Sequence, residues 1–176
     1  MMTDYPFTLK FALPESADPA SHVEKLAACG CDDALIGIGK VGRIALDFNR
    51  SAASANEAVL SALRDVRKAI PGAKFIEAVP DLVGLSDVAE LAGCSRQNMR
   101  KITASDFDFP TAVHDGNPGL FHLVEVLAWL EQSKQEPIDR VLLEVARTNR
   151  AVNLAKQIRT LPNQRVSREI LDGCVA

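Results

Sequence analysis

The chain has 176 residues, 47% of them hydrophobic and 24% charged, with a formal net charge of −3, values typical of a globular protein with one domain or two small ones. No segment approaches the about 18 consecutive apolar residues of a membrane helix, and no basic region followed by an apolar one marks a secretion signal, so we expect a cytoplasmic protein with no membrane partner. The four cysteines and three histidines show no zinc-site spacing, so we expect reduced thiols, no metal and no cofactor.

Residues 1–80 alternate between strand and helix patterns. Apolar and polar side chains alternate, as in strands, over residues 5–13, 34–37, 43–48 and 74–79. Two helices are indicated between them, the first beginning at the Asp18-Pro19 cap and ending at Gly30, the second beginning at Ser54. The order βαββαβ predicts a ferredoxin-like domain, in which two helices cover one face of an antiparallel sheet.

Both helices carry an apolar stripe that we expect to be buried against this sheet. The stripe of the first helix comprises Val23, Leu26 and Ala27. The stripe of the second comprises Val59, Leu60, Leu63, Val66 and Ile70.

The same region contains no recognisable catalytic arrangement. The ferredoxin-like fold hosts enzymes, sensors and pairing modules alike. An acylphosphatase-like site would need a glycine-rich anion loop after the first strand, where this chain has Pro14-Glu15-Ser16. Gly37-x-Gly39-x-x-Gly42 matches a dinucleotide fingerprint as a string, but it lies in an expected hairpin and opens no helix. We therefore expect no enzyme, while a ligand-sensing role stays open.

Residues 85–102 have the spacing of a helix-turn-helix, in which two short helices cross at a steep angle. This geometry needs a small residue at the crossing and a glycine with positive φ in the turn, and Ala89 and Gly93 stand at these positions. Ser86 is expected to cap the first helix. The inward-facing positions are expected to be Val88, Ala92, Cys94, Met99 and Ile102.

The second helix of this pair is expected to begin after Ser95, its N-cap, and to present polar side chains outward. These side chains are Arg96, Gln97, Asn98, Arg100 and Lys101. Arginine pairs with guanine, and amide side chains pair with adenine, in the major groove of DNA. We therefore interpret this face as one that reads bases; the alternative is an α-hairpin whose polar face is only solvated.

A wing and a packed helix are indicated next. Phe109–Val113, a glycine turn over residues 114–119 and Leu120–His122 suggest a β-hairpin, and residues 124–130 suggest a helix. The succession Ser-Arg-Gln-x-Met-x-Lys, Phe-Pro, glycine turn, aromatic residue and Glu-Val-x-x-Trp-Leu resembles the winged helix-turn-helix of AlpA-type and excisionase-type regulators, relatives of the MerR DNA-binding domain.

This resemblance covers about residues 81–132 and implies that Arg96, Gln97 and Arg100 contact the major groove of double-stranded DNA. It also implies that the wing approaches the neighbouring minor groove or backbone. One departure concerns the wing, because such regulators carry arginines beside its aromatic residue, whereas Phe121 has only leucines and a histidine around it. His114 and Asn117 are the substitutes that the chain offers for this contact.

Charge is distributed unevenly along the chain. Residues 1–84 carry 9 basic and 11 acidic side chains, residues 85–137 carry 4 and 8, and residues 138–176 carry 7 and 4. The expected helix-turn-helix thus lies in the most acidic segment. Phosphate contacts must come from the local cluster of Arg96, Arg100 and Lys101, because the overall field does not attract DNA.

The last part, residues 137–176, is expected to begin with a long helix over residues 138–161. Its apolar stripe comprises Val141, Leu142, Val145, Val152, Leu154, Ala155, Ile158 and Leu161. A helix of about 24 residues spans about 36 Å, more than a small winged domain needs to cover its core. We therefore expect a homodimer contact, with packing onto the chain's own sheet as the alternative.

The sequence thus predicts an α+β protein in three parts: a ferredoxin-like domain (1–80), a winged helix-turn-helix (81–136) and a helical dimerisation element (137–176). The expected function is that of a dimeric, sequence-specific DNA-binding repressor. The alternative is an antitoxin-like or adaptor protein that holds a partner protein encoded nearby, with DNA binding secondary.

Overall fold

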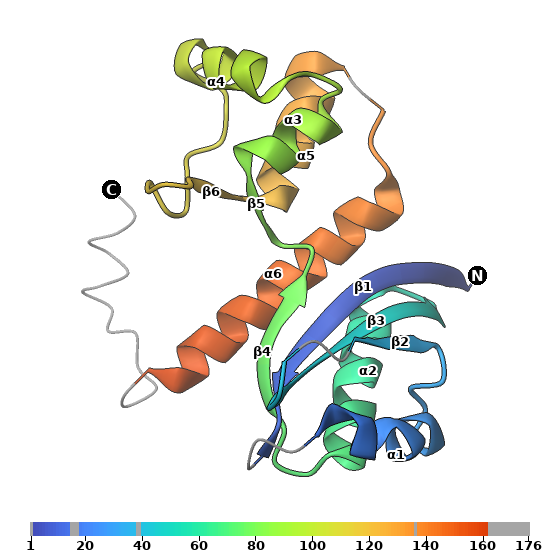
Figure 1. The fold of residues 1–176 in the computed structure, drawn as a ribbon. Helices are drawn as coiled ribbons and strands as arrows, with labels where there is room; N and C mark the ends of the chain where they lie inside the picture. The colour runs from blue at the N-terminus through green and yellow to red at the C-terminus, as the bar shows by residue number, and fades with distance from the viewer. Residues whose placement is uncertain (1, 15–17, 38–39, 136, 162–176) are drawn as a thin grey trace.

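The computed structural model describes residues 2–14, 18–37, 40–135 and 137–161. The chain forms a mixed α/β structure with one four-stranded and one two-stranded antiparallel sheet. The two sheets lie at opposite ends of the molecule, and the long helix α6 runs between them (Figure 1). In the ranges given, no helix is both long enough and apolar enough to cross a membrane.

The larger sheet comprises β1 (Thr3–Ala12), β2 (Ala34–Gly37), β3 (Arg43–Ala52) and β4 (Lys74–Val79). Its strands are arranged in the order β2-β3-β1-β4, and every neighbouring pair is antiparallel. One face is apolar because alternate side chains of β1 and β3 point to it, and Leu9 and Leu46 on this face are fully buried. β3 continues past Phe48, where the sequence pattern predicted its end, because Arg50 and Ala52 keep the same inward alternation.

Two of the expected helical regions follow β1 and β3. The first consists of a 3-10 turn, η2 (Pro19–His22), and the short helix α1 (Val23–Ala28); the second is α2 (Ala55–Ala69). Asp18 caps η2 by accepting a hydrogen bond from the backbone N–H of Ala20 at 3.0 Å. Ser54 caps α2 in the same way through the N–H of Glu57, at 3.2 Å.

The apolar stripes of these helices are only partly buried. Leu26 and Val59 are fully buried, as predicted. Val23 is 38% exposed and Leu60 is 42% exposed, so the prediction that both face the core is wrong. The reason for Leu60 is that α2 packs against α6 as well as against the sheet, and Leu60 lies on the open side of that second contact.

Helix α6 (Arg140–Thr160) begins at Asp139, whose side chain accepts a hydrogen bond from the N–H of Val141 at 2.8 Å. It contributes Val145 to the core of the larger sheet, and Leu143 and Ala146 to the core at the other end of the molecule. The helix expected to form a separate third part is therefore an element of both cores. Its buried side chains are accounted for by packing within the chain.

The free edge of β4 is covered by α6. The side-chain amide of Asn153 accepts a hydrogen bond from the N–H of Ala78 at 2.8 Å and donates one to its carbonyl at 2.9 Å, as a neighbouring strand would. Asn153 also donates to the carboxylate of Asp81 at 2.7 Å, whose other oxygen lies 2.8 Å from Nδ1 of His122. Because Asp81 and His122 are buried, this network ties the two ends together, and His122 has a structural role in it.

The smaller sheet pairs β5 (Leu82–Gly84), a strand that the sequence did not predict, with β6 (Leu120–His122). Three helices share one apolar core with it: α3 (Leu85–Leu91), α4 (Arg96–Ser105) and α5 (Leu123–Lys134). The ring of Phe109 packs edge-on against those of Phe121 and Trp129, with centroids 5.1 and 5.0 Å apart. Phe121 and Trp129 are therefore core residues.

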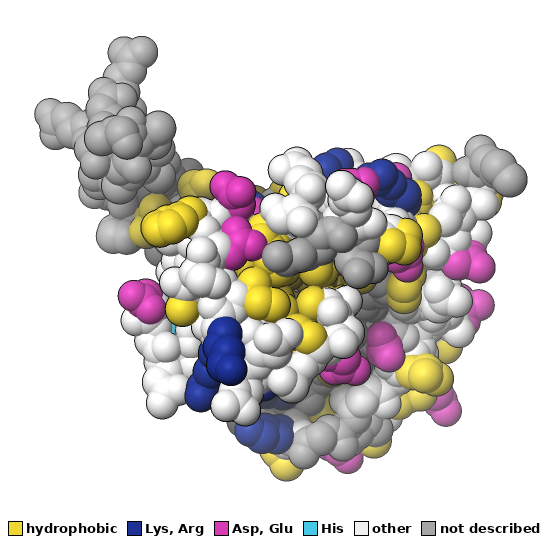
Figure 2. All heavy atoms as spheres, turned by 90° about the horizontal axis from the view of Figure 1, so that it is seen from above, with side chains coloured by type: hydrophobic (Ala, Val, Ile, Leu, Met, Phe, Trp, Pro, Cys, Tyr) yellow, Lys and Arg dark blue, Asp and Glu magenta, His cyan; other side chains and the backbone are white. Residues whose placement is uncertain are grey.

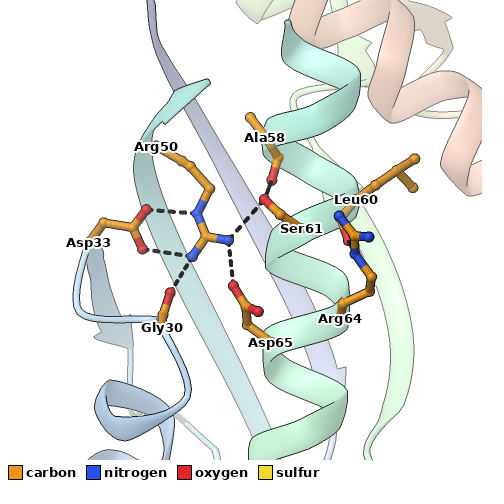
Figure 3. A network of polar contacts seen from close by, with 8 residues as sticks. All are labelled: Gly30, Asp33, Arg50, Ala58, Leu60, Ser61, Arg64 and Asp65. Atoms are coloured by element: carbon orange, nitrogen blue, oxygen red, sulfur yellow. Dashed lines mark hydrogen bonds and ion pairs between the residues drawn. The ribbon is translucent and has the colours of Figure 1, made fainter. Parts of the chain in front are cut away.

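A buried arginine joins strand β3 of the larger sheet to α2 and to the residues between α1 and β2 (Figure 3). Arg50 on β3 donates its Nε–H and one Nη2–H to the carboxylate of Asp33, at 2.7 and 2.9 Å. It donates the remaining hydrogens to Asp65 and Ser61 of α2 and to the carbonyl of Gly30. Burial alone would lower the pKa of Arg50, but its hydrogen bonds to both carboxylates raise the pKa above its ordinary value, so the side chain stays charged.

Candidate nucleic-acid interface

The helix pair α3–α4 begins at a cap that differs from the predicted one. Gly84, not Ser86, is the N-cap of α3, and its N–H donates a hydrogen bond to the carboxylate of Asp87 at 2.8 Å. Ser86 lies within the first turn, so the prediction that it caps the helix is wrong. The physical reason is that β5 runs directly into α3, which leaves no residue between strand and helix.

The turn between α3 and α4 has the predicted glycine geometry. Gly93 has a φ of +60°, a value that residues with a Cβ rarely adopt. The N–H of Cys94 donates to the carbonyl of Ala89 at 2.9 Å, and that of Gly93 donates to the carbonyl of Glu90 at 3.1 Å. These two bonds form a Schellman motif, which ends α3 and fixes the direction of the next helix.

The predicted inward positions of the pair all join one apolar core. Val88, Ala89 and Met99 are at most 2% exposed. Ala92, Cys94 and Ile102 are partly buried and pack against the same cluster. This packing determines which side of α4 is left for solvent.

The exposed side of α4 carries the predicted base-reading residues. Ser95 caps the helix by accepting a hydrogen bond from the N–H of Asn98 at 3.2 Å. Five side chains are exposed on the first two turns: Arg96, Gln97, Asn98, Arg100 and Lys101. Within the described part of the chain, none of the five makes a side-chain hydrogen bond or an ion pair. Their donors are therefore available to a ligand.

The predicted wing is present only in part. Residues 109–113 form no strand; the loop is closed instead by the N–H of Val113, which donates to the carbonyl of Leu120 at 2.7 Å, and by a bridge between Leu120 and His114. Residue 110 is a proline, which cannot donate to a strand neighbour. The prediction of a two-stranded hairpin over residues 109–122 is therefore wrong in its first strand.

His114 and Asn117 lie on this loop and are exposed. The loop is separated from α4 in Figure 1, where it turns back beside β6. The imidazole of His114 lies against Gly116, where an added Cβ would come within 2.2 Å of Nε2. The structure thus brings together six of the eight predicted site residues, those from Ser95 to Lys101, and leaves these two apart.

Acidic side chains are exposed on the segments directly before and after α4. Asp87 and Glu90 are exposed on α3, and Asp108 is exposed after α4. Seen from above, basic side chains stand at separate places among acidic and polar ones (Figure 2). The basic side chains on the exposed side of α4 therefore stand apart from any larger basic surface in this view.

One exposed residue near α4 was missed by the sequence analysis. Phe107 is fully exposed, at 103% of its reference area, in the loop that directly follows α4. Its neighbours Asp106 and Asp108 gave the loop a polar appearance, which hid the aromatic side chain between them.

Comparison of the chain with models of known protein families, with characterised proteins and with solved structures found no match. Among the residues that the structure describes, no group of three or more His, Cys, Asp or Glu side chains is placed to hold a metal ion.

Proposed function

We propose that the chain is a sequence-specific DNA-binding regulator that reads the major groove with α4. The observation that carries the proposal is the exposed side of this helix, where two arginines, a lysine, a glutamine and an asparagine stand together without partners in the described structure. Arginine and amide side chains discriminate base edges in the major groove. The 10 residues of α4 make a helix about 15 Å long, and the diameter of an α-helix, about 10–12 Å with its side chains, fits the major groove, which is about 12 Å wide.

The fold classes that accompany this proposal are a ferredoxin-like domain and a winged helix-turn-helix. The antiparallel order β2-β3-β1-β4, with α2 packed against β1 and β3, supports the first. The Schellman turn at Gly93, the small Ala89 and the pairing of β5 with β6 support the second. In this arrangement the larger sheet serves as a regulatory or pairing domain.

Selection from a pool of random DNA duplexes tests the proposal. The full chain should enrich duplexes that share a motif, and its affinity for the enriched duplex should exceed that for a scrambled duplex by about a thousandfold or more at physiological salt. Enrichment without a shared motif, or equal affinity for both duplexes, contradicts sequence-specific binding.

Regulators of this kind act on promoters. We propose that this chain represses its own promoter or a neighbouring promoter.

We also propose that the regulator is a homodimer, paired through the exposed apolar side of α6. Leu154, Ile158 and Leu161 are 41%, 47% and 45% exposed and follow one another at helical spacing on one side of the helix. Two-fold pairing is the commonest symmetry of oligomers and matches the two-fold symmetry of many operators.

We expect the double variant Leu154→Glu, Ile158→Glu to be a monomer. The two new carboxylates would have to be buried in the contact, which costs more than an apolar pairing returns. Light scattering during size-exclusion chromatography measures the mass. Leu35→Glu is the matched control, because Leu35 is 76% exposed on β2 and its replacement should leave the mass unchanged. A monomeric parent, or a double variant that stays dimeric, contradicts the proposed pairing.

A second candidate function, that of an adaptor for another protein, is favoured by Phe107. A fully exposed phenylalanine between two aspartates suits a protein contact better than a DNA contact, since phosphates repel carboxylates. An adaptor that does not read DNA would enrich no motif in the selection above.

A further inference from the structure

A groove of about 400 Å³ lies between α2 and α6, on the side of the larger sheet that faces these helices. Its apolar lining consists of Leu60, Leu63, Phe75, Val152 and Ala155. Leu60 and Arg64 project from α2 toward the side where α6 runs, away from the Arg50 network (Figure 3). The exposure of Leu60, which the sequence pattern assigned to the core, is a consequence of this groove.

The rim of the groove is strongly basic. It carries Arg64 and Arg67 from α2 and Lys156 and Arg159 from α6, against a single acidic residue, Glu57. Glu57 is already engaged, because its carboxylate accepts a hydrogen bond from the N–H of Ala53 at 3.2 Å.

The four cations have almost no partners of their own. Nε of Arg64 donates to the carbonyl of Leu60 at 3.3 Å. In the described ranges of the chain, the side chains of the other three make no hydrogen bond or ion pair. The groove therefore combines an apolar floor with an unneutralised positive rim.

We propose that this groove binds a small amphipathic carboxylate, an apolar body of medium chain length that ends in one carboxylate. The volume lies in the range of small-molecule sites, about 300–1,000 Å³. The apolar floor suits the body of such a ligand, and the guanidinium groups of Arg64 and Arg67 suit its carboxylate, which they can hold through charge-assisted hydrogen bonds.

Binding in the groove has a route to α4. The C-terminal half of α6 lines the groove with Val152 and Ala155, and its N-terminal half places Leu143 and Ala146 in the core that also holds α3 and α4. A ligand that shifts α6 relative to α2 would therefore change the position of the base-reading side. This step rests on the function proposed above, whereas binding of the carboxylate does not.

Isothermal titration of the full chain with sodium decanoate, without DNA, tests the binding. Saturable binding of one decanoate is expected, with decan-1-ol bound at least about tenfold more weakly because it has no charge for the basic rim. Arg64→Gln with Arg67→Gln should weaken decanoate binding by about tenfold or more. Lys68→Gln with Lys74→Gln, which removes two charges from exposed positions outside the groove lining, should leave it within about twofold.

Leu60→Asp provides a second variant at an exposed position, and it should abolish binding by placing a carboxylate on the apolar floor. No saturable binding of decanoate, equal binding of decan-1-ol, or equal weakening by both double variants would overturn the proposal.

The coupling between the groove and α4 has its own test. Saturating decanoate should change the affinity of the parent chain for the selected duplex by about fivefold or more. An unchanged affinity would overturn the coupling alone, and a chain that binds decanoate but no DNA would overturn only the proposed function.

Discussion

Arg50→Ala is expected to lower the free energy of unfolding by about 3–5 kcal/mol, the cost of removing one partner from a buried ion pair. Arg50 is 8% exposed and its guanidinium donates to two carboxylates, a carbonyl and a hydroxyl. Its loss leaves Asp33 and Asp65 close together without a cation. Urea unfolding followed by circular dichroism measures the change.

Two further variants show whether the arginine network is the cause. Arg43→Ala, at an exposed position on the same strand, should change the stability by less than about 0.5 kcal/mol. Adding Asp33→Asn and Asp65→Asn to Arg50→Ala should restore part of the loss, because the uncompensated charges are then removed. A loss below about 1 kcal/mol for Arg50→Ala, or no restoration, would contradict the structural role of this network.

Arg96→Ala with Arg100→Ala is expected to weaken binding to the selected duplex by about 30-fold or more. Each base-reading arginine contributes about 1–3 kcal/mol, and the lower bound for two corresponds to this factor. Fluorescence anisotropy at fixed, moderate salt measures the affinity. Both side chains are exposed and make no hydrogen bond or ion pair within the described chain, so the urea midpoint should stay that of the parent.

The matched control for this double variant is Arg43→Ala with Lys68→Ala, which removes the same charge from exposed positions of the larger sheet and α2, outside the groove. It should weaken binding by no more than about threefold, since it changes only the long-range field, which salt screens. Equal weakening by both pairs would show that net charge, not the α4 face, governs the affinity.

Much of the fold was predictable because its signals are local. The caps at Asp18, Ser54 and Ser95 use side chains that bond the backbone two or three residues away, and period-two alternation located all four strands of the larger sheet. The errors fall where local pattern and tertiary context disagree. The predicted end of β3 is too early because an arginine is usually a surface residue. Arg50 is nevertheless buried, since its ion pairs with Asp33 and Asp65 balance its charge.

Other elements have no local signal of sufficient length. β5 has three residues and exists because it pairs with β6, about 40 residues later in the chain. Leu60 follows the spacing of the core stripe, and only the approach of α6 decides that it lines a groove instead.

The functional features also differ in how far the sequence predicts them. The exposed side of α4 was predictable because the buried Met99 fixes, by helical periodicity, which residues point outward. Two other features depend on residues that are far apart in the sequence. One is the hydrogen bond between Asn153 and Ala78, and the other is the groove, whose four cations come from α2 and α6. No spacing rule for a single helix or strand brings them together.

The selection of DNA duplexes, repeated with the Arg96→Ala, Arg100→Ala variant, tests the central claim most directly. If α4 reads bases, the variant should enrich a motif that has lost its preference at one or more G·C pairs that the parent requires, because arginine is the side chain that pairs with guanine. Recovery of the parent's motif with unchanged preference at every position would contradict the claim that these arginines read the sequence.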